Sequence, residues 1–129
     1  MKRIFMTRAF VRWLRRSAVS EAALSVAVAE MSAGLVDADL GGSVVKKRVP
    51  IAGRGKRGGA RTLVATNRGD RWFFVFGFEK NERSSITRRE LEALQALART
   101  LLDLSAAELD AQVTQQLLKE IPHDQGANH

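Results

Sequence analysis

The chain has no cysteine and no tyrosine, and its two histidines, His123 and His129, stand in the C-terminal tail. Without cysteine there can be no disulfide, thiolate metal site or cysteine nucleophile, and this absence is typical of proteins in a reducing compartment. The position of the histidines argues against a histidine-pair nuclease and against a zinc site. A cysteine nucleophile, a zinc site and a histidine-pair nuclease are therefore not expected.

Long hydrophobic runs are also missing. No apolar stretch approaches the roughly 20 residues that a membrane helix needs. The N-terminal stretch MKRIFMTRAFVRWLRR has charges throughout its apolar residues, which is not the pattern of a secretory signal. At 129 residues, 45% of them hydrophobic, the chain is long enough to form one domain with its own core. We expect a cytoplasmic protein with no membrane contact, a single domain over residues 1–121 and a polar tail over residues 122–129.

Acidic residues are almost absent from one part of the chain. The net charge is +7, and residues 46–71 contain nine basic residues and a single acid, Asp70. This window therefore carries +8, and the rest of the chain sums to −1. A concentrated basic zone on a nearly neutral body indicates a protein that binds a polyanion. The alternative interpretation is a solvated basic loop.

Apolar periodicity and turn residues predict the order βααβββαα, an α+β domain with helices segregated from an antiparallel sheet. Strands are expected at residues 3–6, 44–49, 61–66 and 71–78, with the last two joined as a hairpin by the turn sequence NRGD. The stretch RWFFVFGF is apolar on both faces, which predicts a central strand. Phe10, Trp13 and Leu14 predict a first helix, Ser20 caps a second, and the capping boxes TRRE and SAAE begin two more. DADLGG and the glycine-rich residues 53–59 are expected to be connections.

Two apparent ligand motifs do not fit their context. Gly53, Gly55 and Gly58 spell G-x-G-x-x-G, but a dinucleotide site needs a helix after this motif and ARTLVAT predicts a strand. Asp37 and Asp39 in one loop, with Glu79 and Glu82 at a strand end, could share a cation, although capping and loop solubility explain them as well. We expect no metal and no cofactor.

The basic window has the chemistry of a phosphate-binding surface. Glycines let the backbone approach a phosphate chain, and Arg and Lys donate charge-assisted hydrogen bonds to its oxygens. If the hairpin places the end of the aromatic strand beside residues 54–61, two basic segments meet on one surface. Cations fixed there would stabilise the charge that develops when a 2′-hydroxyl attacks a phosphate, without a metal. The candidate RNA-binding residues are Lys46, Lys47, Arg48, Arg57, Phe78, Lys80 and Arg88.

Two motifs together, GRGKRGGAR at residues 53–61 and GFEKNERSSI at residues 77–86, resemble signatures of the RelE/HigB superfamily of bacterial type II toxins, and the likeness extends to about Leu118. The resemblance implies a small α+β domain with a twisted antiparallel sheet. It implies an endoribonuclease that cuts mRNA on the ribosome through metal-free 2′-hydroxyl attack and so inhibits translation. It also implies a cognate antitoxin, often of the helix-turn-helix type. By position, Arg54, Lys56 and Arg61 would hold and polarise the phosphate, and Arg83 would contact it.

The chain departs from the family pattern at two positions. Asn81 stands where members often have arginine, and Thr87 stands where they often have an aromatic residue that stacks on a base. Two alternatives to an mRNA interferase therefore stay open: a non-catalytic module that binds nucleic acid or a partner, and a gyrase inhibitor of the same superfamily. The basic face of the first helix, with Arg8, Arg12, Arg15 and Arg16, could bind ribosomal RNA or an acidic antitoxin segment.

Overall fold

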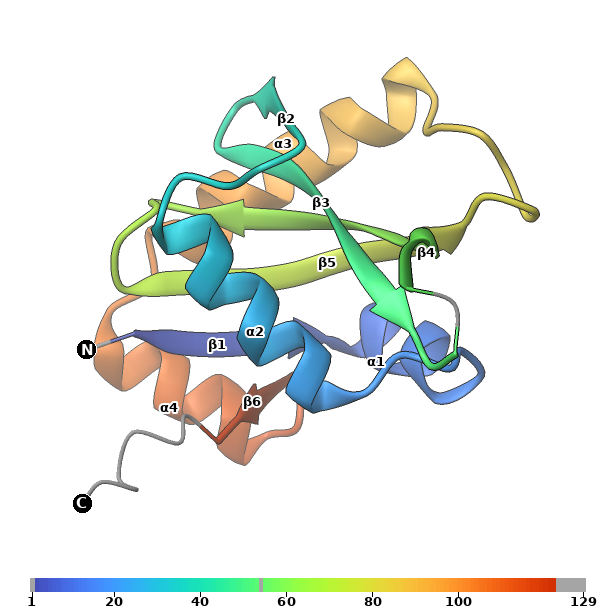
Figure 1. Cartoon of the computed structure of the whole chain (residues 1–129). Coiled ribbons are helices and arrows are strands. Elements are labelled where there is room, and N and C mark those ends of the chain that lie inside the picture. Colours follow the sequence, from blue (N-terminus) through green and yellow to red (C-terminus); the bar gives the residue numbers. More distant parts are fainter. Residues whose placement is uncertain (1, 54, 123–129) are drawn as a thin grey trace.

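The structure is a computed structural model that describes residues 2–53 and 55–122, without the side chains of residues 55–58. A six-stranded sheet lies at its centre, and helices cover both faces of this sheet (Figure 1). The strand order is β2-β3-β4-β5-β1-β6; the pairs are antiparallel except for β1 with β5. The strands are β1 (Arg3–Thr7), β2 (Ala38–Gly41), β3 (Val44–Ile51), β4 (Gly55–Thr66), β5 (Arg71–Glu79) and β6 (Leu118–Ile121). The helices are α1 (Arg8–Arg15), α2 (Glu21–Ser32), α3 (Arg88–Leu102) and α4 (Ala106–Thr114).

The predicted α+β class is confirmed, and so are the predicted helices and the hairpin. The two capping boxes are formed at Thr87 with Glu90 and at Ser105 with Glu108. The aromatic strand β5 is central, because β4 and β1 pair with its two edges. No helix in the described part of the chain is long and apolar enough to span a membrane.

Three parts of the sheet differ from the predicted order. The stretch expected to be a loop before Gly42 contains β2, which pairs with β3. A sixth strand, β6, follows α4 and pairs with β1. The glycine-rich stretch is mostly strand, since β4 begins at Gly55 and Ile51 pairs with Gly55. In each case pairing with a neighbouring strand stabilises a segment that is too short or too rich in glycine to show a strand pattern of its own.

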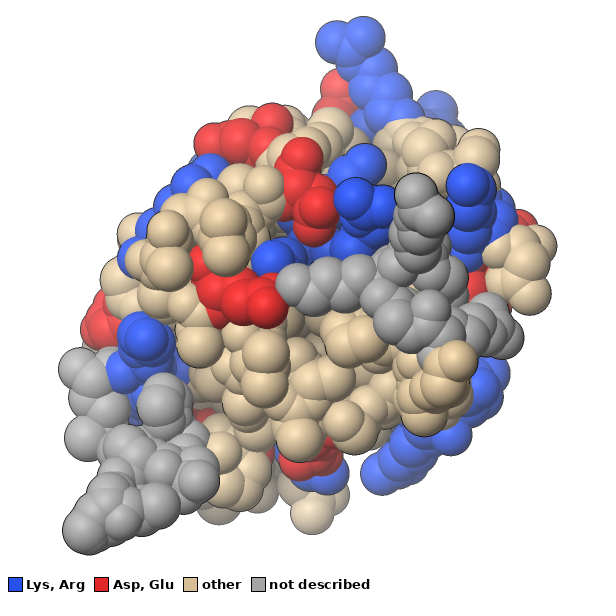
Figure 2. Space-filling model, in the orientation of Figure 1, with Lys and Arg blue, Asp and Glu red and all other residues tan. Residues whose placement is uncertain are grey.

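The two faces of the sheet carry separate hydrophobic cores, as alternation along a strand requires. Under α1 and α2 the core includes Ile4, Trp72 and Phe74. On the opposite face, Phe5 and Phe73 belong to the core that α3 and α4 cover. Helix α2 lies in front of the sheet in Figure 1, whereas α3 and α4 lie behind it. Figure 2 therefore shows the α2 face, and uncharged residues occupy much of the lower part of that face in this view.

A β-bulge at Val75 changes the alternation in β5. Leu63 of β4 pairs with Phe76 and Val64 pairs with Phe74, which leaves Val75 as the extra residue. Val75 and Phe76 consequently both contribute to the α3 face, and Gly77 turns toward α1. A Cβ atom on Gly77 would lie 2.5 Å from Cε3 of Trp13, so glycine is required for Trp13 to cover the strand here. Beyond Phe74, β5 has α1 beside it instead of β1.

Candidate nucleic-acid interface

Two cations and an aromatic residue form a row across three adjacent strands. Arg48 of β3 is the cross-strand partner of Arg61 in β4, and Arg61 is the partner of Phe78 in β5. Side chains of directly opposed residues lie on the same face, roughly 5 Å apart at Cβ. Arg61 is two residues before Leu63 in β4, so the two side chains lie on the same face of the sheet. Leu63 is buried in the core under α3, and the row therefore lies on the α3 face. The expectation that the end of the aromatic strand lies beside the basic segment around Arg61 is confirmed.

Arg61 has donors to spare in this row. Its side chain is half-buried, and in the described part of the chain its one hydrogen bond runs from Nη1 to the carbonyl oxygen of Gly59 at 3.2 Å. A guanidinium has five N–H donors, so most remain for a ligand. Arg48 is exposed and its Nε lies 3.4 Å from Oδ1 of Asp37. This weak, solvated pair is easily exchanged for a phosphate.

The two lysines before Arg48 have different environments because they alternate across β3. Lys46 is half-buried and pairs in register with Leu63, on the face of the row. Lys47 is 4% exposed on the α2 face, where its Nζ lies 2.9 Å from Oε1 of Glu30 and donates to the carbonyl oxygen of Leu35 at 2.8 Å. The expectation that Lys47 binds RNA is therefore corrected: its ammonium group is used inside the fold.

Phe78 offers less than its position suggested. It is 4% exposed, and its ring lies 6.1 Å from the ring of Phe76. It therefore forms an apolar floor beside Arg61, and it has no open face on which a base could stack. This part of the prediction for Phe78 is corrected.

Arg83 is engaged with the start of α3. Its Nη1 and Nη2 donate to the two carboxylate oxygens of Glu90 at 2.9 and 2.6 Å, and its Nε donates to the carbonyl oxygen of Ser85 at 3.0 Å. The guanidinium also lies over the ring of Phe76, 5.6 Å from its centroid. The hydrogen bonds from Arg83, with one from the Thr87 backbone, lower the pKa of Glu90 to about 2. Arg83 thus stands near the row, but with a carboxylate already bound.

The other candidate cations surround this region. Lys80 is exposed in the turn that follows β5. Arg88 is 91% exposed at the first position of α3, and its Nε lies 3.6 Å from Oε2 of Glu92. Arg54 lies outside the described residues, and so do the side chains of Lys56 and Arg57. The backbone of Lys56 and Arg57 belongs to β4, the strand that carries Arg61.

A depression of about 340 Å³ adjoins the row at the edge of β5 that α1 covers. Its charged lining consists of three cations, Arg12, Arg16 and Arg83, and one acid, Glu82, and Trp13 and Phe78 are among its aromatic residues. The sequence did not point to this site, because the helix and the strand that line it, α1 and β5, lie far apart in the chain and meet only in the fold. The cations can bind the phosphates of a nucleic acid, whereas Trp13 and Phe78, 6% and 4% exposed, offer no open ring face to a base.

The acids proposed as alternative metal ligands have other partners. Asp37 accepts from Arg48, Asp39 pairs with Arg68 at 3.0 Å, and Glu82 accepts from the backbone N–H of Glu79 at 2.7 Å. Among the described residues, no group of three or more acids or histidines is placed to hold a metal ion. These carboxylates stabilise loops and the end of β5.

Nearly the whole chain matches a known protein family. Residues 2–121 match the family described as the RelE toxin of the RelE / RelB toxin-antitoxin system. The chain belongs to the RelE toxin family. It is therefore a toxin of a toxin–antitoxin system, and an antitoxin is its implied partner. No curated protein matches the chain.

Membership of the RelE family gives the basic row a context but does not assign its chemistry. RelE toxins are typically endoribonucleases. The row and the depression beside it carry basic side chains on and next to the sheet.

Proposed function

We propose that this RelE toxin is an mRNA endoribonuclease that acts on the ribosome and needs no metal, with the α3 face of β3, β4 and β5 as its RNA site. The observation that carries the proposal is the placement of Arg61 between Arg48 and Phe78, on the strand that also carries Lys56. Arg54, Lys56 and Arg61 hold the scissile phosphate, and Lys46, Arg48 and Arg57 bind the neighbouring backbone.

The reaction that suits these residues is an internal transfer. The 2′-oxygen attacks the adjacent phosphorus, the bond from phosphorus to the 5′-oxygen breaks, and a 2′,3′-cyclic phosphate and a 5′-hydroxyl result. Negative charge accumulates on the phosphate oxygens during the attack, and preorganised guanidinium and ammonium groups stabilise it. Because the chain has no tyrosine and its histidines are in the tail, its own candidates for proton transfer are lysines and acids.

Two measurements test this function: growth after induction of the protein, and the order in which protein synthesis and DNA synthesis decline. We expect induction of the wild type to stop growth, and labelled methionine incorporation to fall before thymidine incorporation. The Arg54→Ala/Lys56→Ala/Arg61→Ala variant should allow growth, because the three charges that face the phosphate are gone. The matched control is Lys2→Ala/Arg68→Ala/Arg99→Ala, which removes the same charge away from the row and should remain toxic.

Two results would contradict the proposal. An early fall in thymidine incorporation would favour gyrase inhibition. Growth arrest by the Arg54/Lys56/Arg61 variant would show that the site is elsewhere.

A non-catalytic RNA-binding module is the second candidate. Two observations favour it: Arg83 is bound by Glu90, and Thr87, at the position expected for a stacking aromatic, caps α3. This candidate predicts RNA binding that weakens steeply with salt, and no cleavage products. Detection of cuts at defined positions would exclude it.

A further inference from the structure

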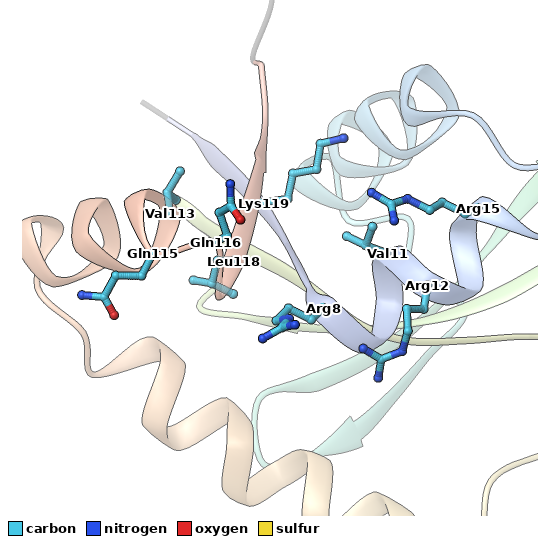
Figure 3. Close-up of a pocket in the computed structure, with 9 residues that line it drawn as sticks. All are labelled: Arg8, Val11, Arg12, Arg15, Val113, Gln115, Gln116, Leu118 and Lys119. Atoms are coloured by element: carbon cyan, nitrogen blue, oxygen red, sulfur yellow. The ribbon is translucent and has the colours of Figure 1, made fainter.

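A second basic surface lies between α1 and β6. It is a groove of about 700 Å³, lined on one side by α1 and on the other by β6 and the end of α4 (Figure 3). Four cations line it, Arg8, Arg12 and Arg15 of α1 and Lys119 of β6, and none of its described lining residues is acidic. We refer to it as the α1–β6 groove.

The three arginines form one ridge along the groove. They stand at i, i+4 and i+7 of α1, on one face, opposite the buried Phe10 and Leu14. Over about seven residues the ridge extends roughly 10 Å. In the described part of the chain these arginines make no ion pair, whereas Lys119 pairs with Glu21 at 3.1 Å. The ridge is therefore an uncompensated set of charges that an acidic ligand could neutralise.

Helix stability does not account for Arg8. It occupies the first position of α1, after the N-cap Thr7, and the first turn of this helix has no acidic residue. A cation near a helix N-terminus is unfavourable, because the helix dipole is positive there. Arg12 and Arg15 stand in the last turn, where the same dipole favours them. The position of Arg8 thus costs the helix stability and adds charge to the groove.

The uncharged lining distinguishes between a nucleic acid and a protein as the ligand. Val11, Val113 and Leu118 give the groove an aliphatic component, and Leu117, next to it in sequence, is 39% exposed. None of the described lining residues is aromatic, whereas sites for single-stranded nucleic acids use aromatic rings to stack bases. Aliphatic contacts beside arginines suit a peptide with both leucine-like side chains and carboxylates.

We propose that the α1–β6 groove binds an acidic, amphipathic segment of the antitoxin, with carboxylates on Arg8, Arg12 and Arg15 and aliphatic side chains against Val11 and Val113. On the sheet, β5 and β1 stand between the row on β4 and the groove at β6, a distance of roughly 14 Å at the usual strand spacing. On α1 the two surfaces meet at Arg12, which lines both the groove and the depression beside the row. The inference rests on membership of a toxin–antitoxin system and does not depend on RNA cleavage.

Equilibrium binding of the full-length cognate antitoxin to the full-length toxin tests this assignment. The variant Arg12→Glu/Arg15→Glu should raise the Kd about 30-fold or more, the usual cost of disrupting desolvated charge pairs at an interface. The matched control Lys2→Glu/Arg99→Glu makes the same charge change outside the groove. It should leave the Kd within about threefold of wild type, because these two cations affect the antitoxin only through long-range electrostatic attraction.

Arg8→Glu separates binding from folding. This substitution places an acid at the start of α1, so the thermal midpoint should stay the same or rise, while the Kd for the antitoxin should increase. Unchanged antitoxin affinity in both groove variants would overturn the proposal. Loss of ribosome binding with unchanged antitoxin affinity would overturn it too, and would assign the groove to RNA.

Discussion

At the scale of residues, the short sequence KKR in β3 shows how neighbouring cations can have different roles. Lys46 and Arg48 lie on the α3 face with Arg61, whereas Lys47 lies under α2 between Glu30 and the carbonyl of Leu35. Alternation along the strand makes this difference unavoidable. A count of basic residues therefore overstates the number that can touch RNA.

Lys47→Ala and Arg48→Ala should separate stability from RNA binding. Removal of the buried ammonium leaves the Leu35 carbonyl without its donor, so Lys47→Ala should lower the free energy of unfolding by about 1–3 kcal/mol. Arg48→Ala should change it by less than about 1 kcal/mol, because its pair with Asp37 is solvated. Urea denaturation checks both values.

RNA affinity should show the opposite order. Arg48→Ala should weaken binding of a single-stranded RNA and reduce the salt slope by about one phosphate contact, whereas Lys47→Ala should leave the slope unchanged. Fluorescence anisotropy over a range of salt concentrations measures it. A reduced slope for Lys47→Ala in a fully folded protein would contradict the assignment.

At the scale of elements, one carboxylate joins the exit of β5 to the start of α3. Glu90 accepts from the backbone N–H of Thr87 at 2.8 Å, within the capping box, and also from Arg83. The loop between β5 and α3 is thereby fixed at both ends. The sequence predicted the capping box, because its spacing is local, but the bond between Arg83 and Glu90 depends on how the loop folds back.

The stability contributed by Glu90 should depend on pH. Its pKa is lowered from 4.5 to about 2, so the folded state favours the ionised form. This contribution is complete above pH 4.5 and is lost as the pH falls through about 2. Glu90→Gln, which can still form a capping box, should therefore be less stable than wild type near neutral pH, and the difference should shrink between pH 4.5 and 2.

Urea midpoints of the two proteins across this pH range provide the measurement, and a carboxyl NMR titration provides the pKa directly. A Glu90 pKa near 4.5, the ordinary value, would show that Arg83 does not hold this carboxylate in solution. Arg83 would then be available to a phosphate, as the resemblance to the toxin family first implied.

The elements that the sequence missed share a physical cause. Strands β2 and β6 have four residues each, too few to show a period, and they form because β3 and β1 offer edges for pairing. The start of β4 is rich in glycine, which usually indicates a connection. Long or strongly apolar elements such as β5 and α3 were predicted, because their own side chains specify them.

At the scale of the whole molecule, the sequence predicted the position of the basic zone and the meeting of Phe78 with the strand of Arg61. It could not show which face of the sheet Phe78 occupies, because the bulge at Val75 shifts the alternation in β5. It also could not show that α1 and β6 form a groove, since their residues are about a hundred positions apart. Such contacts depend on tertiary packing, which local patterns do not encode.

The fold separates two basic surfaces that a toxin of this family can use in different ways. The row on β3, β4 and β5 places Arg48 and Arg61 beside Phe78, and the α1–β6 groove has cations beside aliphatic side chains. We assign the first to RNA and the second to the antitoxin. Arg12 lines both the groove and the depression beside the row, whereas Arg8 and Arg15 line the groove alone among these two sites. Variants at Arg8 or Arg15 should therefore leave the function of the RNA row in place.

Primer extension on a defined mRNA, in a purified translation system with and without ribosomes, tests the central claim most directly. The account predicts cuts at defined positions that require ribosomes, occur with the Lys2/Arg68/Arg99 control and disappear with the Arg54/Lys56/Arg61 variant. Intact mRNA under every condition, with wild-type toxin that still binds RNA, would contradict the account and show that this chain binds RNA without cutting it.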